Sequence, residues 1–506
     1  MTKPVRVRFA PSPTGPLHIG GVRTALYNYL YAKKNNGDFI LRIEDTDQNR
    51  FVEGAEQYII EALKWLGICP NEGVGFGDGA YAPYRQSDRK DSYKQYAEQL
   101  IQTGNAYYAF DTEAELEQMK ASNPNFKYDA ATRENGTNSL TLSDEAVKKR
   151  LAQNEHYVIR IKLPAEEEVK FHDEIRGWVT VNTLQMDDKV LLKSDGMPTY
   201  HLANVCDDYV MKISHVIRGE EWLPSAPLHV LLYRFLGWES SMPKFAHLPL
   251  LLKPDGNGKL SKRDGDRLGF PVFPLDWTDH KTGEISSGYK QRGYLPEAVI
   301  NMLAFLGWNP GTEQEIFSLN ELVDAFNLDH IHKAGAKFDF EKAKWFNTEY
   351  IKQLNNEQLA TLVKTQVELK FGKQDFQFLT RAVGLVKERL IFLTDITQYH
   401  YLFETPTEYP DTALAKIANI IESDFQPEIF ISFLNNEPSL SDSALLELRI
   451  KDFATSNMIK PGDLMKYLRV SLVGELSGPA IPNLIQLLGI KETEIRLQNC
   501  FDKLNK

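Results

Sequence analysis

The first 47 residues place a turn rich in proline and glycine, residues 11–21 (PSPTGPLHIGG), between two strand patterns. Apolar residues alternate with arginine over residues 5–9, which predicts a strand with one apolar face. Apolar positions at helical spacing follow the turn over residues 22–30, and a second apolar run comes next, over residues 39–43. The order strand, turn, helix, strand predicts a right-handed crossover between parallel strands.

The turn has the chemistry of an anion site. It lies where such a unit binds its ligands, outside the carboxyl ends of the strands. The first amide groups of the helix are expected to lack partners and to carry the positive end of the helix dipole. Gly20 and Gly21 would let a phosphate approach the backbone, and His18 can donate a hydrogen bond. A surface turn with an incidental histidine would give the same pattern, so the turn by itself leaves both interpretations open.

A second motif stands far downstream: the basic loop of residues 253–263 (KPDGNGKLSKR). By itself it predicts only a solvated loop. Together with the turn, it resembles the two signature motifs of class I aminoacyl-tRNA synthetases. Four further segments resemble glutamyl-tRNA synthetases of the bacterial type: residues 8–15 (RFAPSPTG), 42–47 (RIEDTD), 192–204 (LKSDGMPTYHLAN) and 216–222 (VIRGEEW).

The resemblance implies an α/β fold: a Rossmann-like parallel sheet, split by an inserted acceptor-stem-binding domain and followed by an all-α C-terminal anticodon-binding region. The implied domains are the first catalytic half, the insert, the second catalytic half, a stem-contact region with the Lys-Leu-Ser-Lys-Arg loop, and the helical end: residues 1–104, 105–189, 190–252, 253–340 and 341–506. Helical periods dominate from Leu295 onward and predict helices over residues 296–306, 340–346 and 378–393 among others, whereas glutaminyl-tRNA synthetases of the eukaryotic type carry β-barrels there. Residues 270–293 are expected to form a surface insertion.

The resemblance also assigns residues to the site. For catalysis these are His18, Lys259 and Lys262. For ATP binding they are Pro11, His18, Gly20, Gly21, Glu221 and Lys262. For glutamate binding they are Arg8, Ser12, Glu44, Tyr200, Asn204 and Arg218. Arg389 is assigned to the last anticodon base.

Activation of glutamate needs these residue types. The amino-acid carboxylate attacks the α-phosphorus of ATP and expels pyrophosphate, which requires positioning and charge stabilisation more than a protein nucleophile. Each donor aimed at the phosphate oxygens is worth roughly 3 kcal/mol. Arg8 offers a bidentate fork for the side-chain carboxylate, and Glu44 offers a carboxylate for the α-amino group. Without the motifs, Arg8 would be a strand-edge charge facing water, Glu44 a capping carboxylate and Arg389 a solvated residue.

Composition bounds the partners and cofactors. The formal net charge is −11, which argues against indiscriminate polyanion binding but permits a local basic surface that docks one shaped RNA. The resemblance implies L-glutamate, ATP, Mg²⁺ and tRNA(Glu), and leaves open whether tRNA(Gln) is charged too. No cysteine lies in residues 105–130, where some relatives carry zinc, and the three cysteines are far apart, so we predict no zinc site.

No apolar run is long enough to cross a bilayer, and the start of the chain leaves no room for a signal peptide, so we expect a cytoplasmic protein without membrane contact. We also expect a monomer.

Three other functions compete with glutamate–tRNA ligation. A tRNA-modifying paralogue lacks the helical C-terminal third, and a small-molecule nucleotidyltransferase is usually under half this length. A non-catalytic tRNA-binding protein should have lost His18 or Lys262. This chain has 506 residues, a helical C-terminal third and both side chains, so the resemblance favours an enzyme that ligates glutamate to tRNA.

Overall fold

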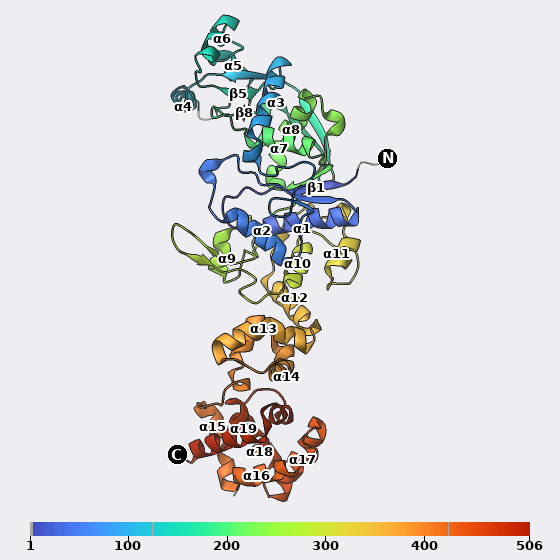
Figure 1. Ribbon diagram of the computed structural model, residues 1–506, viewed down its shortest axis with the longest axis vertical. Coiled ribbons are helices and arrows are strands. Elements are labelled where there is room, and N and C mark those ends of the chain that lie inside the picture. Colours follow the sequence, from blue (N-terminus) through green and yellow to red (C-terminus); the bar gives the residue numbers. More distant parts are fainter. Residues whose placement is uncertain (1–3, 124–125, 424, 506) are drawn as a thin grey trace. The chain divides into compact units, whose positions relative to one another are not determined.

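The computed structural model describes residues 4–123, 126–423 and 425–505, and of residues 262, 263, 266 and 422 only the backbone. The chain divides into two units, which are described one at a time (Figure 1). The first unit comprises residues 1–291 and 296–343, and the second comprises residues 292–295 and 344–506.

The predicted strand, turn, helix and strand are present in the first unit as β1 (Arg6–Phe9), α1 (Ile19–Lys34) and β2 (Asp38–Leu41). β1 pairs with β2 in parallel, and β3 (Glu72–Gly73) extends the sheet beyond β2 in the same direction. All four residues of β1 are buried, so the expected solvent-facing side of this strand is absent. Its arginines must therefore find partners inside the protein.

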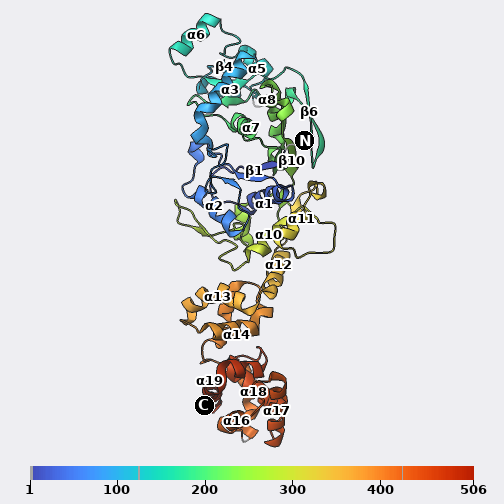
Figure 2. The ribbon, with the colours of Figure 1, turned by 45° about the vertical axis from the view of Figure 1, so that its right-hand side comes forward.

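A second sheet carries the other half of the catalytic fold. Its strand order is β7 (Gly177–Asn182), β6 (Glu168–Asp173), β10 (Lys244–Leu248) and β9 (His215–Gly219). β6, β10 and β9 run parallel, whereas β7 returns antiparallel to β6. β6 and β10 lie side by side in Figure 2.

The two sheets meet at β1 and β9. The backbone N–H of Ser214, just before β9, donates to the carbonyl of Arg6 at 2.8 Å. Carboxyl ends of strands from both sheets thus reach one edge. β6 and β7 come from the range predicted as the insert, residues 105–189, yet they belong to this sheet because β6 pairs with β10.

The third sheet is antiparallel and consists of β4 (Ala106–Ala109), β5 (Val158–Ile161) and β8 (Val190–Leu192). β8 was expected to resume the nucleotide fold, but it pairs with β5 of the inserted segment. The helices between β4 and β5 are α4 (Glu113–Ser122), α5 (Ala130–Asn135) and α6 (Asp144–Ala152).

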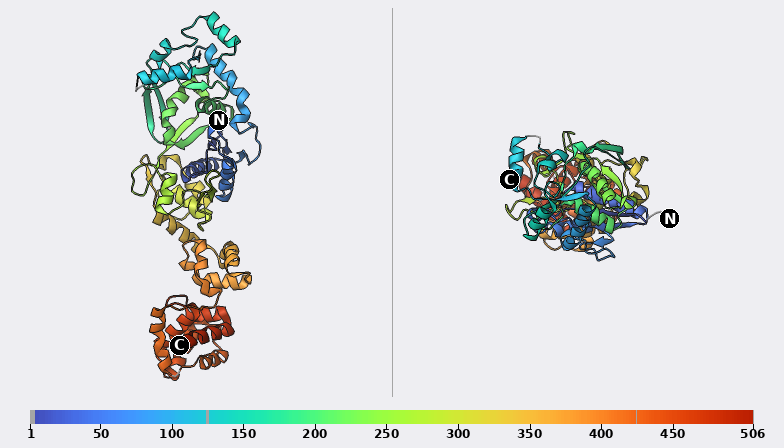
Figure 3. Two further views of the ribbon diagram at one scale, coloured as in Figure 1. Left: turned by 90° about the vertical axis from the view of Figure 1, so that its left-hand side faces the viewer. Right: turned by 90° about the horizontal axis from the view of Figure 1, so that it is seen from above.

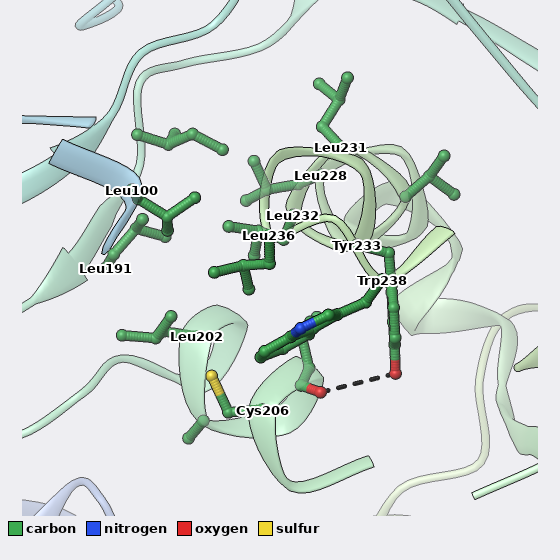
Figure 4. Packing of buried hydrophobic residues seen from close by; sticks show 14 of the residues in the cluster. Leu100, Leu191, Leu202, Cys206, Leu228, Leu231, Leu232, Tyr233, Leu236 and Trp238 are labelled. Atoms are coloured by element: carbon green, nitrogen blue, oxygen red, sulfur yellow. Dashed lines mark hydrogen bonds between the residues drawn. The ribbon is translucent and has the colours of Figure 1, made fainter. Parts of the chain in front are cut away.

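Packing between α7 (Tyr200–Val210) and α8 (Ala226–Phe235) holds the helix whose first turn enters the site. Buried residues of both helices, Cys206 among them, form one apolar cluster (Figure 4). Each large apolar side chain buried in this way stabilises the fold by roughly 2 kcal/mol. The hydroxyl of Tyr233 also donates to the carbonyl of Val205, at 3.5 Å. Packing against α8 therefore fixes the position of α7.

The segment of residues 253–263, which by itself predicted only a solvated loop, leads into a helix, α9 (Lys262–Leu268). Ser261 caps this helix in a capping box with Asp264, which explains why a segment rich in glycine and aspartate turns helical. The stretch 270–293 contains a small antiparallel hairpin, but it is not only the surface insertion that was expected, because Phe270, Val272, Phe273 and Tyr289 are buried.

The other elements of the first unit are α2 (Ala55–Trp65), α3 (Lys90–Gln102), α10 (Pro296–Ala304), α11 (Leu319–Ala325), the hairpin strands β12 (Trp277–Thr278) and β13 (Ile285–Ser286), and the short parallel pair β11 (Leu251–Leu252) and β14 (Ala336–Lys337).

The regular secondary structure of the second unit is helical among the residues described (Figure 3). α12 (Phe340–Gln353) leads into it, and the helices that follow are α13 (Asn356–Phe371), α14 (Phe376–Val386), α15 (Asp411–Ile417), α16 (Pro427–Asn435), α17 (Ser443–Ser456), α18 (Pro461–Val473) and α19 (Ile481–Leu504). The helix predicted over residues 378–393 ends at Val386 and continues only as a 3₁₀ turn, Lys387–Arg389. Asp395 accepts the amides of Ile391 and Phe392 and so starts a new turn there.

No helix in the described part of the chain combines the length and the apolar character that a membrane span requires.

Candidate active site

A cavity of about 440 Å³ opens at the shared edge of the first two sheets. All six residues assigned to glutamate binding line it: Arg8, Ser12, Glu44, Tyr200, Asn204 and Arg218. Four of the residues assigned to ATP binding line it too: Pro11, Gly20, Gly21 and Glu221. The structure therefore gathers residues from β1, α1, α7 and β9 around one space. Among the described side chains, those of Lys259 and His18 are not part of this lining.

Two buried guanidinium groups and two buried carboxylates form a cluster beside the cavity, and two of the four residues, Arg8 and Glu44, line it. Arg8 Nε and Arg42 Nη1 donate to the same oxygen of Asp208, at 3.0 and 2.7 Å. Arg42 Nη2 donates to Glu44 at 2.9 Å, and Asn204 Nδ2 donates to that oxygen of Glu44 at 3.0 Å. Arg8 is only 3% exposed, so it is not the strand-edge charge facing water that its position in the sequence also allowed. Its two Nη groups make no hydrogen bond to any described residue.

The charges in this cluster set the protonation of its carboxylates. Burial alone raises the pKa of Asp208, but Arg8 and Arg42 together hold it below its ordinary value. Burial raises the pKa of Glu44 above its ordinary value, and this rise is opposed by Arg42 and Arg8. Asp208 therefore acts as the anion that keeps two neighbouring guanidinium groups in place.

Arg218 lies across the cavity with neutral partners. Its Nη1 donates to the hydroxyl of Tyr200 at 2.7 Å, and its Nη2 donates to the carbonyl of Trp222 at 3.4 Å. Its Nε donates to His247 Nε2 at 3.0 Å. The ring of Tyr200 rests on that of Trp222, with centroids 4.3 Å apart. Arg218 contacts no carboxylate among the described residues, unlike Arg8.

The amides at the start of α1 are satisfied by the protein itself, contrary to the expectation from the sequence. The Gly20 N–H donates to His18 Nδ1 at 3.1 Å, and the Gly21 N–H donates to the His18 carbonyl at 2.8 Å. The Ile19 N–H donates to the carbonyl of Val272 at 2.9 Å. Sequence reasoning missed these partners because one is a histidine cap and the other comes from a distant segment. Since Nδ1 accepts, a neutral His18 carries its proton on Nε2.

The two glycines of the turn have different reasons to be glycine. A Cβ atom on Gly21 would lie 2.6 Å from Leu17 Cδ1, so close packing within the turn excludes a side chain there. A Cβ atom on Gly20 would meet nothing closer than His18 Nδ1 at 3.5 Å. Gly20 is therefore the position where a side chain would enter the cavity without disturbing the fold.

The basic loop reaches the cavity through Lys259. Its ammonium lies 2.8 Å from a carboxylate oxygen of Glu221, one of the lining residues. Burial raises the pKa of Glu221, but the hydrogen bond and charge of Lys259 bring it below its ordinary value. Lys262 is the first residue of α9, and its side chain lies outside the described residues.

A smaller cavity of about 360 Å³ shares lining residues with the first, among them Ser12, Glu44 and Tyr200. Lys193 and Arg50 also line it. The two spaces therefore adjoin along these shared residues.

Residues 4–345 match the family model described as tRNA synthetases class I (E and Q), catalytic domain. The chain is 53% identical to the glutamate–tRNA ligase of Amoebophilus asiaticus and 54% identical to that of Flavobacterium johnsoniae, over 98% and 100% of each chain. The chain belongs to the glutamate–tRNA ligase family of class I synthetases. Residues 342–501 of this synthetase match a model described as an anticodon binding domain.

Solved structures agree with this assignment. A glutamate tRNA ligase from Elizabethkingia meningosepticum, crystallised in complex with its amino acid, superimposes on the synthetase with a TM-score of 0.94. The two are 48% identical, and the match covers 99% of this chain and 100% of that one. The synthetase is thus an enzyme of the ligase class, with the catalytic and helical architecture that the sequence predicted.

Arg389 lies in the second unit of the synthetase, in a short 3₁₀ turn. Its side chain is exposed and donates from Nη2 to the carbonyl of Gly478 at 3.0 Å. The guanidinium is therefore held by the protein rather than fully solvated. The role of Arg389 at the last anticodon base stays a prediction.

Several site residues were not anticipated. Asp208 lies four residues after Asn204 on α7, a spacing that puts both on one helix face and that could have identified it. Arg42 is the first residue of the motif at residues 42–47, but the sequence did not indicate that it would be buried next to Glu44. His247 gave no signal in the sequence because its partner is on another strand.

Proposed function

We propose that this synthetase ligates L-glutamate to tRNA(Glu) at the 440 Å³ cavity in two steps. In the first step the α-carboxylate of glutamate attacks the α-phosphorus of ATP, the bond to pyrophosphate breaks, and glutamyl-adenylate forms. In the second step the 2′-hydroxyl of the 3′-terminal adenosine attacks the activated carbonyl and AMP leaves. The observation that carries the proposal is the convergence of all six assigned glutamate residues on one cavity.

Charge complementarity supports glutamate as the amino acid. Arg218 and the Nη groups of Arg8 present cationic donors without a carboxylate already bound to them, which suits the side-chain carboxylate of glutamate. Glu44 supplies the negative charge for the α-amino group. Glutamine would bring an NH₂ group where the arginines need an acceptor, and a buried unpaired donor costs enough for strong discrimination.

The phosphates require donors, which we assign to the turn and the basic loop. His18 carries its proton on Nε2, Lys259 already reaches Glu221 at the cavity, and Lys262 follows three residues later. Mg²⁺ would be held by the phosphate oxygens of ATP and its own waters, since it rarely needs an all-protein cage. Among the described residues no group of three or more His, Cys, Asp or Glu side chains is placed to bind a metal, which suits an ion that arrives with the nucleotide.

The smaller cavity provides a place for the terminal adenosine beside Tyr200 and Glu44. Lys193 and Arg50 there are cations suited to the RNA backbone. The helical second unit would read the anticodon, with Arg389 contacting the last base by an edge hydrogen bond. We propose tRNA(Glu) as the cognate tRNA, and transfer assays with purified tRNA(Gln) decide whether it is a second one.

Exchange of labelled pyrophosphate into ATP, measured with glutamate and tRNA(Glu), tests the proposal. We expect exchange that needs both glutamate and tRNA and that glutamine does not support. Arg8→Gln should raise the KM for glutamate, and Lys262→Ala should lower the rate about a hundredfold with the fold intact. Exchange that is independent of glutamate, or equal with glutamine, would refute the proposed function.

A further inference from the structure

We propose that His247 and Asp173 are positioning residues that hold Arg218 for the side-chain carboxylate of the amino acid. The inference rests on the proposed function, because it needs Arg218 to be the cation that meets glutamate. It adds two buried residues that do not line the cavity and that act through Arg218.

The three residues lie on three neighbouring strands at the same end of the sheet. Arg218 of β9 is opposite His247 of β10 in the parallel register, and β6, which ends in Asp173, pairs with β10 on its other side. His247 and Asp173 are both fully buried. The parallel arrangement thus brings their side chains into one row that leads from the interior to the cavity.

The hydrogen bonds in this row fix the protonation of His247. Arg218 Nε can only donate, so His247 Nε2 must accept at 3.0 Å and carry no proton. The proton of a neutral ring then sits on Nδ1, which donates to Asp173 Oδ2 at 2.6 Å. Burial lowers the pKa of His247 to about 4, so the ring is neutral at physiological pH.

Asp173 is itself held in one orientation. Its Oδ1 accepts the backbone N–H groups of Ile175 and Arg176, at 3.0 and 2.8 Å, which leaves Oδ2 toward His247. Burial alone raises the pKa of Asp173, but the hydrogen bonds from His247 and Arg176 hold it below its ordinary value. The carboxylate therefore selects the Nδ1–H tautomer of the imidazole and makes Nε2 a stronger acceptor.

The neutral ring has a consequence for amino-acid selection. The partners of Arg8 and Arg42 include carboxylates, whereas Arg218 is held by a hydroxyl, a carbonyl and an imidazole. A carboxylate in the place of His247 would orient Arg218 equally well but would also neutralise it. Here the negative charge lies on Asp173, which contacts His247 and not Arg218. Arg218 is therefore oriented without being neutralised, and its positive charge can attract the carboxylate of the ligand.

Two substitutions at His247 separate its two hydrogen bonds. Gln places an amide oxygen near the position of Nε2, so His247→Gln keeps an acceptor for Arg218. Asn places its amide near Nδ1, so His247→Asn keeps contact with Asp173 but cannot reach Arg218. We expect His247→Asn to raise the KM for glutamate about tenfold or more and His247→Gln to raise it much less, with the KM for ATP unchanged within about twofold in both.

Asp173→Asn tests the tautomer directly. The side-chain amide of Asn would direct an NH₂ group at Nδ1, so the imidazole proton would move to Nε2 and face the donor of Arg218. We expect a rise of about tenfold or more in the KM for glutamate. In the His247→Gln background the same substitution should have little effect, because an amide oxygen has no tautomer to change.

The pyrophosphate exchange assay is run on the full chain, with thermal unfolding as the check on folding and His215→Asn as the matched control. His215, the first residue of β9, is partly buried and makes hydrogen bonds with Tyr31 and Ser214. It does not line the cavity, so its substitution should leave both KM values unchanged within about twofold. Equal effects of Asp173→Asn in both backgrounds, or equal rises in the KM for ATP and for glutamate, would mean that the row is only structural and overturn the inference. An unmodified chain without glutamate-dependent exchange would instead refute the proposed function.

Discussion

The ammonium group of Lys259 lies 2.8 Å from a carboxylate oxygen of Glu221, which joins the basic loop to the edge of the cavity. Both side chains are about half exposed, at 55% and 43%, so the pair adds at most about 1 kcal/mol to stability. The contact is more informative about function than about stability, because it places a cation next to residues that line the cavity.

Lys259→Ala should therefore impair catalysis without unfolding the protein. We expect the exchange rate to fall between about 10-fold and 100-fold, since a donor for the phosphates is lost, and the unfolding free energy to change by less than about 1 kcal/mol. Lys451→Ala is the control, because Lys451 makes a comparably exposed ion pair with Glu447 in the second unit. Equal rates for Lys259→Ala and the unmodified chain would remove this lysine from the mechanism.

The two glycines of the turn should respond differently to alanine. Gly21→Ala places a methyl group 2.6 Å from Leu17 Cδ1 and should destabilise the fold by about 1–3 kcal/mol. Gly20→Ala has room, so the unfolding midpoint should not fall, but its methyl group enters the cavity and should raise the KM for ATP. Urea unfolding and exchange kinetics separate the two; equal loss of stability in both variants would contradict this interpretation of the turn.

Asp208 should be among the most costly carboxylates to neutralise. Asp208→Asn leaves Arg8 and Arg42 buried with less negative charge, and we expect a loss of about 3–5 kcal/mol in unfolding free energy. Asp38→Asn is the control, because Asp38 is half exposed and its partner Arg6 also contacts Glu72; it should cost less than about 1 kcal/mol. Similar losses in the two variants would show that the buried cluster is not special.

Stability should fall as the pH drops from 6.5 toward 5. Burial lowers the pKa of His201, His215 and His247 to about 4, below the ordinary value of 6.5. In this window only the unfolded chain takes up their protons, so the stability present above pH 6.5 is lost on acidification, by up to about 1.4 kcal/mol per pH unit for each histidine. Urea unfolding of the first unit at pH 7, 6 and 5 measures the slope. His215→Asn should reduce this dependence of stability on pH. An unchanged slope in that variant would contradict the lowered pKa of His215.

Local patterns predicted the elements well where they carried the whole signal. The opening crossover and the helix that begins at Pro296 both follow from apolar spacing and from turn residues. The predicted end of one helix, at residue 393, was wrong for a local reason too. Asp395 accepts hydrogen bonds from the amides of Ile391 and Phe392, and these bonds start a new turn in place of the helix.

Contacts between distant segments could not be predicted from the sequence. The six residues assigned to glutamate binding were identified from motifs, and the structure shows that they line one cavity. Nothing near Arg8 in the sequence indicates Asp208 as its partner, because Asp208 lies on α7, 200 residues further along the chain. Nothing near Arg218 indicates His247 either, because parallel pairing of β9 and β10 brings these two residues together. For the same reason the amide of Ile19 was expected to be open, although the carbonyl of Val272 occupies it.

A crystal structure of the synthetase with glutamate and ATP bound tests the central claim most directly. The account predicts the side-chain carboxylate of glutamate within hydrogen-bond reach of Arg218 and Arg8, and the α-phosphate in the same cavity beside Gly20, with a lysine of the basic loop on the phosphate oxygens. A triphosphate found away from both the turn at residues 18–21 and the loop at residues 253–263 would contradict it.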